Sequence, residues 1–177
     1  MKPMDQNEPR EDCLWVDSSR CIGCFSCEVA CQMEHDLPPG PRPIRVMQIG
    51  PLEHRDGLLM TFQPAACQHC TQPACAAACP RGAMQKRADD IVISDPEICI
   101  GCQTCAFACP YGTPQLNPGL GKIAKCDGCA DRVDQGLSPA CVLACPTEAL
   151  SFGTPINITY KAREQAALAL CQYGSSR

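Results

Sequence analysis

Cysteine is the residue type in this chain that could do chemistry, and its spacing is regular. The run Cys99-Ile-Gly-Cys-Gln-Thr-Cys-Ala-Phe-Ala-Cys-Pro110 has the pattern Cys-x2-Cys-x2-Cys-x3-Cys-Pro. Variants of it recur, so that 16 of the 18 cysteines form four groups of four. The groups are Cys21, Cys24, Cys27 and Cys31; Cys67, Cys70, Cys75 and Cys79; Cys99, Cys102, Cys105 and Cys109; and Cys126, Cys129, Cys141 and Cys145. The last three groups end in Cys-Pro, whereas Gln32 follows Cys31.

This spacing favours iron–sulfur chemistry. A four-iron cube takes four thiolates, and in two-cluster ferredoxins the fourth cysteine of each run ligates the other cluster. Sixteen grouped cysteines therefore predict four [4Fe-4S] clusters. Zinc is the main alternative because Cys-x2-Cys pairs are common zinc ligands, but three cysteines within seven residues suit a cube better than a single ion. A disulfide framework ranks behind both, since no secretory signal indicates an oxidising compartment.

The composition is consistent with metal clusters in the interior. A chain of 177 residues forms one domain or two small joined ones, yet it has only four Phe, three Tyr and one Trp. Its 17 Pro and 13 Gly predict a loop-rich backbone. Folds with few core side chains often depend on disulfides or metals for stability.

Location and partner class follow from the remaining composition. The polar N-terminal stretch lacks an apolar signal region and a twin-arginine pair, which predicts a cytoplasmic protein. Export on a partner's signal stays open. No window reaches the roughly twenty apolar residues of a membrane-spanning helix. A net charge of −4 without a basic stripe argues against nucleic acid as a partner.

Short elements are expected between the cysteine groups, giving an α+β fold. A strand at 14–17, with Trp15 packed in the core, is expected to pair with a closing strand at 150–152. Apolar/polar alternation predicts a hairpin over 43–63, and turn residues predict a second one from 83–86 and 91–93. Residues 111–119 are expected to be a loop and 127–135 a short helix. Residues 160–173 are expected to form a helix that covers the chain's own core or frays as an ordinary terminal helix, with docking on a partner as the alternative.

The cysteine motifs resemble a known family. Cys21-Ile-Gly-Cys-Phe-Ser-Cys-Glu-Val-Ala-Cys31, Cys67-Gln-His-Cys-Thr-Gln-Pro-Ala-Cys75, Cys99 to Pro110 and Lys125-Cys-Asp-Gly-Cys129 are similar to the four-cluster ferredoxin-type electron-transfer subunits of molybdenum and tungsten pterin enzymes. These enzymes include formate dehydrogenases, dimethyl sulfoxide and polysulfide reductases and aldehyde oxidoreductases. Similar chains serve carbon monoxide dehydrogenases and hydrogenases. The resemblance covers about residues 14–152.

The resemblance implies a nested set of ligands, which we name quartets A to D. Quartet A is Cys21, Cys24, Cys27 and Cys145; quartet B is Cys67, Cys70, Cys75 and Cys109; quartet C is Cys99, Cys102, Cys105 and Cys79; quartet D is Cys126, Cys129, Cys141 and Cys31. Spacing alone supports the inner pair, B and C. It does not establish the outer pair, because pairing the first group with the second and the third with the fourth satisfies the same ligand count. Some relatives hold a three-iron cluster where Trp replaces a cysteine of the third group, and Cys102 here predicts a complete set.

The implied architecture is two pseudo-symmetric modules of bacterial-ferredoxin type. A four-cluster domain is expected over 13–155, between a polar N-terminal segment, 1–12, and a helical tail, 156–177. Its inner module would span about 64–112. Its outer module would combine about 13–42 with 120–155, and the hairpin 43–63 would be an insertion.

The expected function is electron transfer without catalysis. No nucleophile, paired general base or phosphate loop stands out. The resemblance implies relay between a catalytic subunit, with a tungsten or molybdenum pterin enzyme of aldehyde oxidoreductase or formate dehydrogenase type favoured, and a second redox partner, through two docking faces. The 99–110 stretch is expected inside the row of clusters. The alternatives are a free polyferredoxin, a subunit of a carbon monoxide dehydrogenase or hydrogenase, and a zinc-binding interaction module.

Residues outside the quartets receive modest roles. Cys13 and Cys171 are expected to be thiols without a metal role. Lys125, Arg81 and Lys122 could raise the reduction potential of a nearby cluster by favouring its more negative reduced state, but a solvated surface charge is the favoured interpretation for each. His69 lies inside a cysteine loop, where hydrogen bonding to a cluster sulfur and a plain loop position are equally open.

Overall fold

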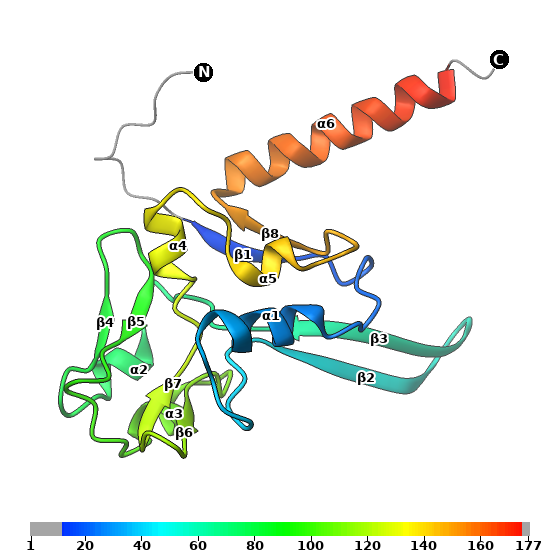
Figure 1. The fold of residues 1–177 in the computed structure, drawn as a ribbon. Helices are drawn as coiled ribbons and strands as arrows, with labels where there is room; N and C mark the ends of the chain where they lie inside the picture. Colours follow the sequence, from blue (N-terminus) through cyan, green and yellow to red (C-terminus); the bar gives the residue numbers. More distant parts are fainter. Residues whose placement is uncertain (1–11, 175–177) are drawn as a thin grey trace.

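Small antiparallel sheets, short helices and long loops build this chain, whose computed structural model describes residues 12–174 (Figure 1). The elements are β1 (Cys13–Val16), α1 (Ser26–Glu34), β2 (Arg45–His54), β3 (Gly57–Ala65), α2 (Ala74–Ala77), β4 (Met84–Lys86), β5 (Val92–Ser94), α3 (Thr104–Ala108), β6 (Gln115–Asn117), β7 (Lys122–Ala124), α4 (Ala130–Asp134), α5 (Ala140–Leu143), β8 (Leu150–Gly153) and α6 (Pro155–Gly174). The loop-rich α+β class is confirmed.

The two ends of the cysteine-rich region meet in one sheet. β1 pairs antiparallel with β8, with Leu14 opposite Phe152 and Val16 opposite Leu150, as the sequence predicts. In Figure 1 the blue β1 lies beside the orange β8. Residues 134 to 140 positions apart thus close the region that holds the first and fourth cysteine groups.

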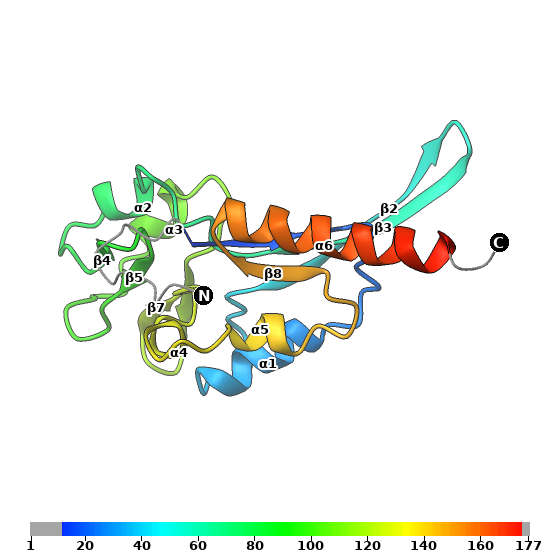
Figure 2. The same ribbon diagram turned by 90° about the horizontal axis from the view of Figure 1, so that it is seen from above.

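Three further sheets are hairpins of neighbouring strands. β2 pairs with β3, and the far part of this hairpin projects from the body (Figure 2). β4 pairs with β5, as expected. The β6–β7 pair lies where a loop was expected. Asn117 makes this turn, because its Oδ1 accepts hydrogen bonds from the N–H groups of Gly119 and Leu120.

Proline sets the lengths of the ligand-bearing helices. α2, α3 and α5 have four or five residues and end just before a Cys-Pro pair, where proline cannot continue the hydrogen-bond ladder. α1 lacks this stop and runs for nine residues through Cys31 to Glu34. The absence of a proline after Cys31 therefore lets α1 continue beyond the fourth cysteine of its group.

The expectation that Trp15 packs in the core is wrong, and α6 excludes one of the two arrangements favoured for the C-terminal helix. Trp15 is 43% exposed and lines a cavity between β1, β8 and α6 instead of lying in the core. α6 begins at Pro155 and contacts β8, but its described side chains are nearly all exposed. It therefore does not cover the chain's core, because its apolar residues are spread around the helix rather than gathered on one face.

The buried interior consists largely of cysteines with a few aliphatic side chains. One core cluster contains Cys27, Cys31 and Cys141 around Ile44 and Leu150. The other contains cysteines of the second and third groups: Cys75, Cys99 and Cys105, packed with Ala83, Met84, Val92 and Ile123. In the part of the chain that the structure describes, no helix is long and apolar enough to span a membrane.

Candidate iron–sulfur sites

Three cavities each bring together four cysteines. They belong to quartets A, C and D, respectively. The sulfur-bearing walls are Cys21, Cys24, Cys27 and Cys145 in the first, Cys79, Cys99, Cys102 and Cys105 in the second, and Cys31, Cys126, Cys129 and Cys141 in the third. The cavities are alike in size, and most of their other lining residues are apolar.

Quartet B is identified from the proximity of its cysteines to one another. Burial raises the pKa of Cys75, and the nearby charges of Cys67 and Cys109 raise it further. Cys70 lies three residues after Cys67 in the same loop and is half-buried. Cys109 therefore lies with the second group, although its own loop carries quartet C.

The outer cysteines lie in the nested arrangement. Cys31 shares a cavity with three cysteines of the fourth group, and Cys145 shares one with three of the first. Sequential pairing would instead place Cys31 with the second group. The resulting ligand sets are argued below as a proposal.

The Cys-Pro pairs give their sulfurs a distinct environment. The backbone N–H of Ala83 donates to Cys79 Sγ, and that of Ala149 donates to Cys145 Sγ, both at 3.2 Å. Burial acts to raise the pKa of each thiol, but hydrogen bonds, mostly from the backbone, outweigh it and lower the pKa. Cys31 lies in α1 without such a turn, and burial together with neighbouring cysteines raises its pKa.

The donor sets fit iron–sulfur clusters. Burial is the main cause that raises the pKa of Cys27 to about 11 and that of Cys126 to about 12. Thiols of this kind stay protonated without a cation, and a bound metal deprotonates them outright. Four sulfurs around each of three dry cavities are what a thiolate-ligated cube requires.

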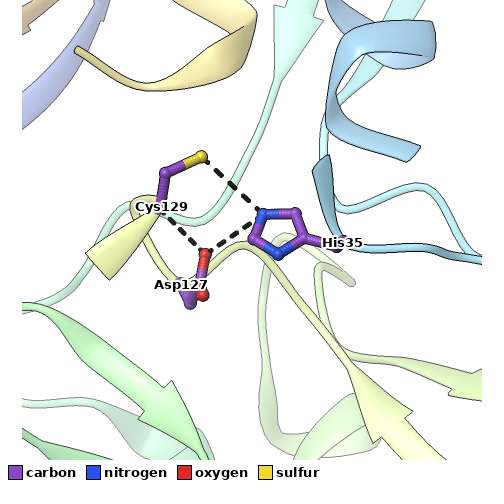
Figure 3. Close-up of side chains that lie close together, drawn as sticks. All are labelled: His35, Asp127 and Cys129. Atoms are coloured by element: carbon purple, nitrogen blue, oxygen red, sulfur yellow. Dashed lines mark hydrogen bonds and ion pairs between the residues drawn. The ribbon is translucent and has the colours of Figure 1, made fainter. Parts of the chain in front are cut away.

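Two histidines flank quartet D, and both line its cavity. Figure 3 shows the His35 ring facing both Cys129 and Asp127: its Nε2 lies 3.7 Å from the sulfur and 3.5 Å from a carboxylate oxygen. These three residues also have metal-ligand geometry, but Cys129 belongs to quartet D, so they form part of that site. His69 Nε2 lies 3.8 Å from Cys126 Sγ.

Lys125 is buried, whereas a solvated surface charge is expected from the sequence. It is 8% exposed. Its Nζ donates to the carbonyl oxygens of Val92 and Cys126, the latter at 2.6 Å. Lys122 is half-buried and donates to Cys99 O, whereas Arg81 is exposed as expected. The lysine next to Cys126 is buried because β5 and the start of the fourth group close around it, a long-range arrangement that its neighbours in sequence do not indicate.

Exposed cysteines mark two different sites. Among the described cysteines, Cys24 of quartet A and Cys102 of quartet C are the exposed ones. The 99–110 stretch therefore reaches the surface at Cys102, and its place in the row of clusters is argued below as a proposal. Gly101 and Gln103, on either side of Cys102, both adopt positive φ.

The remaining cysteines are outside the quartets. Cys13 Sγ lies 3.7 Å from Gly153 O across the β1–β8 pair. The side chain of Cys171 lies outside the described residues.

Comparison with known proteins agrees with the cysteine geometry. A family model of the 4Fe-4S dicluster domain matches residues 58–155, and a second model with the same description matches residues 20–83. The B subunit of the anaerobic dimethyl sulfoxide reductase of Escherichia coli is 43% identical over 163 residues, 88% of this chain and 80% of the relative.

Two other relatives are named for different enzymes. Thiosulfate reductase electron transfer subunit PhsB of Salmonella typhi is 45% identical, over 77% of this chain and 72% of the relative. Formate dehydrogenase-O iron-sulfur subunit of Escherichia coli is 35% identical, over 93% of this chain and 60% of the relative. With its motifs, its cysteine-lined cavities and these matches, the chain belongs to the 4Fe-4S dicluster family of iron–sulfur electron-transfer proteins.

Proposed function

We propose that this chain relays single electrons through four [4Fe-4S] clusters, held by quartets A to D, between a catalytic oxidoreductase subunit and a second redox partner. The clusters supply one-electron transfer when bound. The observation that carries the proposal is the gathering of cysteines from different groups around shared cavities.

Contacts between cysteines suggest the order A, D, B, C. Cys141 of quartet D has a pKa raised by burial and by neighbouring cysteines, Cys27 of quartet A among them. Cys67 of quartet B acts in the same way on Cys126 of quartet D. Cys75 of quartet B acts on Cys105 of quartet C. An unbranched row of this kind suits conduction from one end to the other.

Both ends of this row carry exposed apolar side chains. Ile22 and Phe25, which flank Cys24, are 61% and 43% exposed. Ile100 lies two residues before Cys102 and is 60% exposed, and Phe107, in the same loop, is 89% exposed. Exposed apolar surface near a redox centre suits protein docking. Two such rims favour a subunit between two partners over a freely diffusing polyferredoxin.

The named relatives guide the choice of catalytic partner. We infer a molybdenum or tungsten pterin subunit, because relatives are named for dimethyl sulfoxide reductase, thiosulfate reductase and formate dehydrogenase. A carbon monoxide dehydrogenase or hydrogenase is the second candidate. Cytoplasmic location is a separate prediction from the sequence, which cell fractionation checks.

Gentle anaerobic purification of the tagged full-length chain tests the function. We expect a large oxidoreductase subunit to co-purify, with about sixteen irons and as many acid-labile sulfides per chain, the content of four four-iron clusters. Mass spectrometry identifies the partner. Zinc without iron, or an iron-loaded monomer without partners, would contradict the proposal.

Substitution of the fourth cysteine in the second or third group tests the ligand sets, because each is proposed to bind the other group's cluster. Cys109→Ser is expected to damage the cluster of quartet B, whereas Cys79→Ser, its matched control, should damage that of quartet C. EPR spectroscopy of the reduced full-length variants distinguishes the two. If Cys109→Ser removed the signal of quartet C first, the exchanged arrangement would be wrong.

A further inference from the structure

His69 occupies a backbone position that glycine fills in the other three groups. The third residue of each group is Gly23, His69, Gly101 or Gly128, with φ of 67°, 44°, 68° and 69°. A positive φ is uncommon for a residue with a side chain. Backbone strain of this kind concentrates at functional sites, so the imidazole at this one position calls for a reason.

The ring of His69 is held in one tautomer. The backbone N–H of Val92 donates to Nδ1 at 2.9 Å. Because Nδ1 accepts this bond, the ring hydrogen lies on Nε2. That atom is 3.8 Å from Cys126 Sγ and therefore points a donor at a sulfur of quartet D. The ring also borders Gly128, where a Cβ would lie in ordinary contact at 3.7 Å from Nε2.

Lys125 precedes Cys126 in the chain and binds the same residue of β5 as His69 does. Its Nζ donates to Val92 O and to Cys126 O. A single buried residue of β5, Val92, thus binds His69 through its N–H and Lys125 through its carbonyl. The lining residues described for the cavities of quartets A and C include no histidine.

These contacts have a definite electrostatic consequence. Reduction adds a negative charge that is shared by the cluster and its thiolates. Hydrogen-bond donors to the sulfurs, and a nearby positive charge, stabilise the reduced form more than the oxidised form. Both groups at Val92 therefore act in the same direction on cluster D.

We propose that His69 is a positioning residue that donates its Nε2 hydrogen to the Cys126 sulfur and, with Lys125, raises the reduction potential of cluster D. The inference rests on the proposed function, since it requires a cluster in quartet D. A residue in the loop of the second cysteine group would thus set the reduction potential of the cluster held mainly by the fourth group. The inner and outer modules would be coupled electrostatically as well as by packing.

An EPR-monitored redox titration of the full-length chain, purified anaerobically with its partner, tests this inference. His69→Asn keeps an acceptor for Val92 N–H, and Asn tolerates positive φ, but it places no donor at the sulfur. We expect one midpoint potential to fall, so that electron occupancy of cluster D decreases about tenfold relative to its neighbours, about 59 mV for a one-electron couple. His69→Gln, which restores a donor near Nε2, should recover most of this shift.

His54→Asn is the matched control, because His54 lies on the projecting hairpin and is half exposed. It should leave all potentials unchanged. Full iron and sulfide content with unchanged potentials in His69→Asn would overturn the inference alone, whereas a wild-type chain without clusters would overturn the proposed function.

If His69→Asn loses iron, a second measurement decides. With [15N]histidine in a His35→Asn background, pulsed EPR of the reduced protein should detect a weak histidine nitrogen coupling at one cluster. Absence of that coupling would overturn the inference.

Discussion

The cavities of quartets C and D have the same kind of ligands and very different surroundings. Quartet C lies at the surface with Cys102 exposed and the apolar Ile100 and Phe107 nearby. Quartet D has three buried cysteines, Cys31, Cys129 and Cys141, with His35 and His69 in the wall of its cavity. Cysteine spacing sets how many clusters the chain can hold, whereas the side chains around each cavity determine what that cluster does.

The difference extends to the fourth ligand of each site. Cys79 of quartet C follows a short helix and accepts a backbone N–H at 3.2 Å. Cys31 of quartet D lies within the longer α1, and its pKa is raised by burial and by Cys126 and Cys129. The surface site therefore carries a sulfur that backbone donors stabilise as a thiolate, while the interior site depends more on the metal itself.

Removal of one ligand from each site should have the largest effect. Cys126→Ala is expected to cost cluster D and the cooperative fold, because Cys126 packs against a buried core cluster that contains Cys31 and Cys141, and metal binding is coupled to folding. Cys102→Ala should cost only cluster C, with most of the remaining iron retained. Iron content and thermal unfolding followed by circular dichroism measure both effects. Equal losses in the two variants would remove the distinction between interior and surface sites.

A smaller effect is expected at Glu28, which anchors α1 beside quartet D. Glu28 is 4% exposed, accepts from Val46 N–H at 2.6 Å and pairs with Arg42 at 2.6 Å. Glu28→Ala leaves a buried N–H without its partner, so the free energy of unfolding should fall by about 2 kcal/mol. For a chain of this size, Tm should fall by about 4–8 °C.

The matched control for Glu28 lies on the same helix. Glu34 pairs with Arg132 at 3.0 Å, and both side chains are partly exposed. Glu34→Ala should lower the free energy of unfolding by less than about 1 kcal/mol. EPR should show clusters A and D lost before B and C in Glu28→Ala. Loss of all four together would indicate that the modules are not separable in this way.

Prediction from the sequence succeeds where the residue pattern is clear, and it fails where a strand is too short to show a pattern or where burial depends on distant contacts. The hairpins at β2–β3 and β4–β5 follow from alternation and turn residues, and the β1–β8 pair follows from the short apolar segments at the two ends of the cysteine-rich region. The β6–β7 hairpin was missed because three-residue strands are too short to show a period. Trp15 was placed in the core on its residue type alone.

The site shows the same division. Groups of four cysteines are visible in the sequence, but the burial of Lys125 and the hydrogen bond from Val92 to His69 depend on β5 crossing to the fourth group. A signal for His69 was present: alignment of the four groups places it opposite three glycines. Its meaning needed the backbone angles and the distance to Cys126.

The smallest expected effect is at Phe107, beside the surface site of quartet C. This side chain is 89% exposed in the loop of quartet C, so Phe107→Ser should leave Tm and cluster content unchanged. If it anchors one partner, affinity for that partner should fall about tenfold, or about 1.4 kcal/mol. Ile22→Ser beside quartet A is the matched variant and should weaken the other partner instead. Binding of each purified partner to both variants measures this exchange. If both substitutions weakened the same partner, the two rims would belong to one interface, and electrons could not enter at one exposed end and leave at the other.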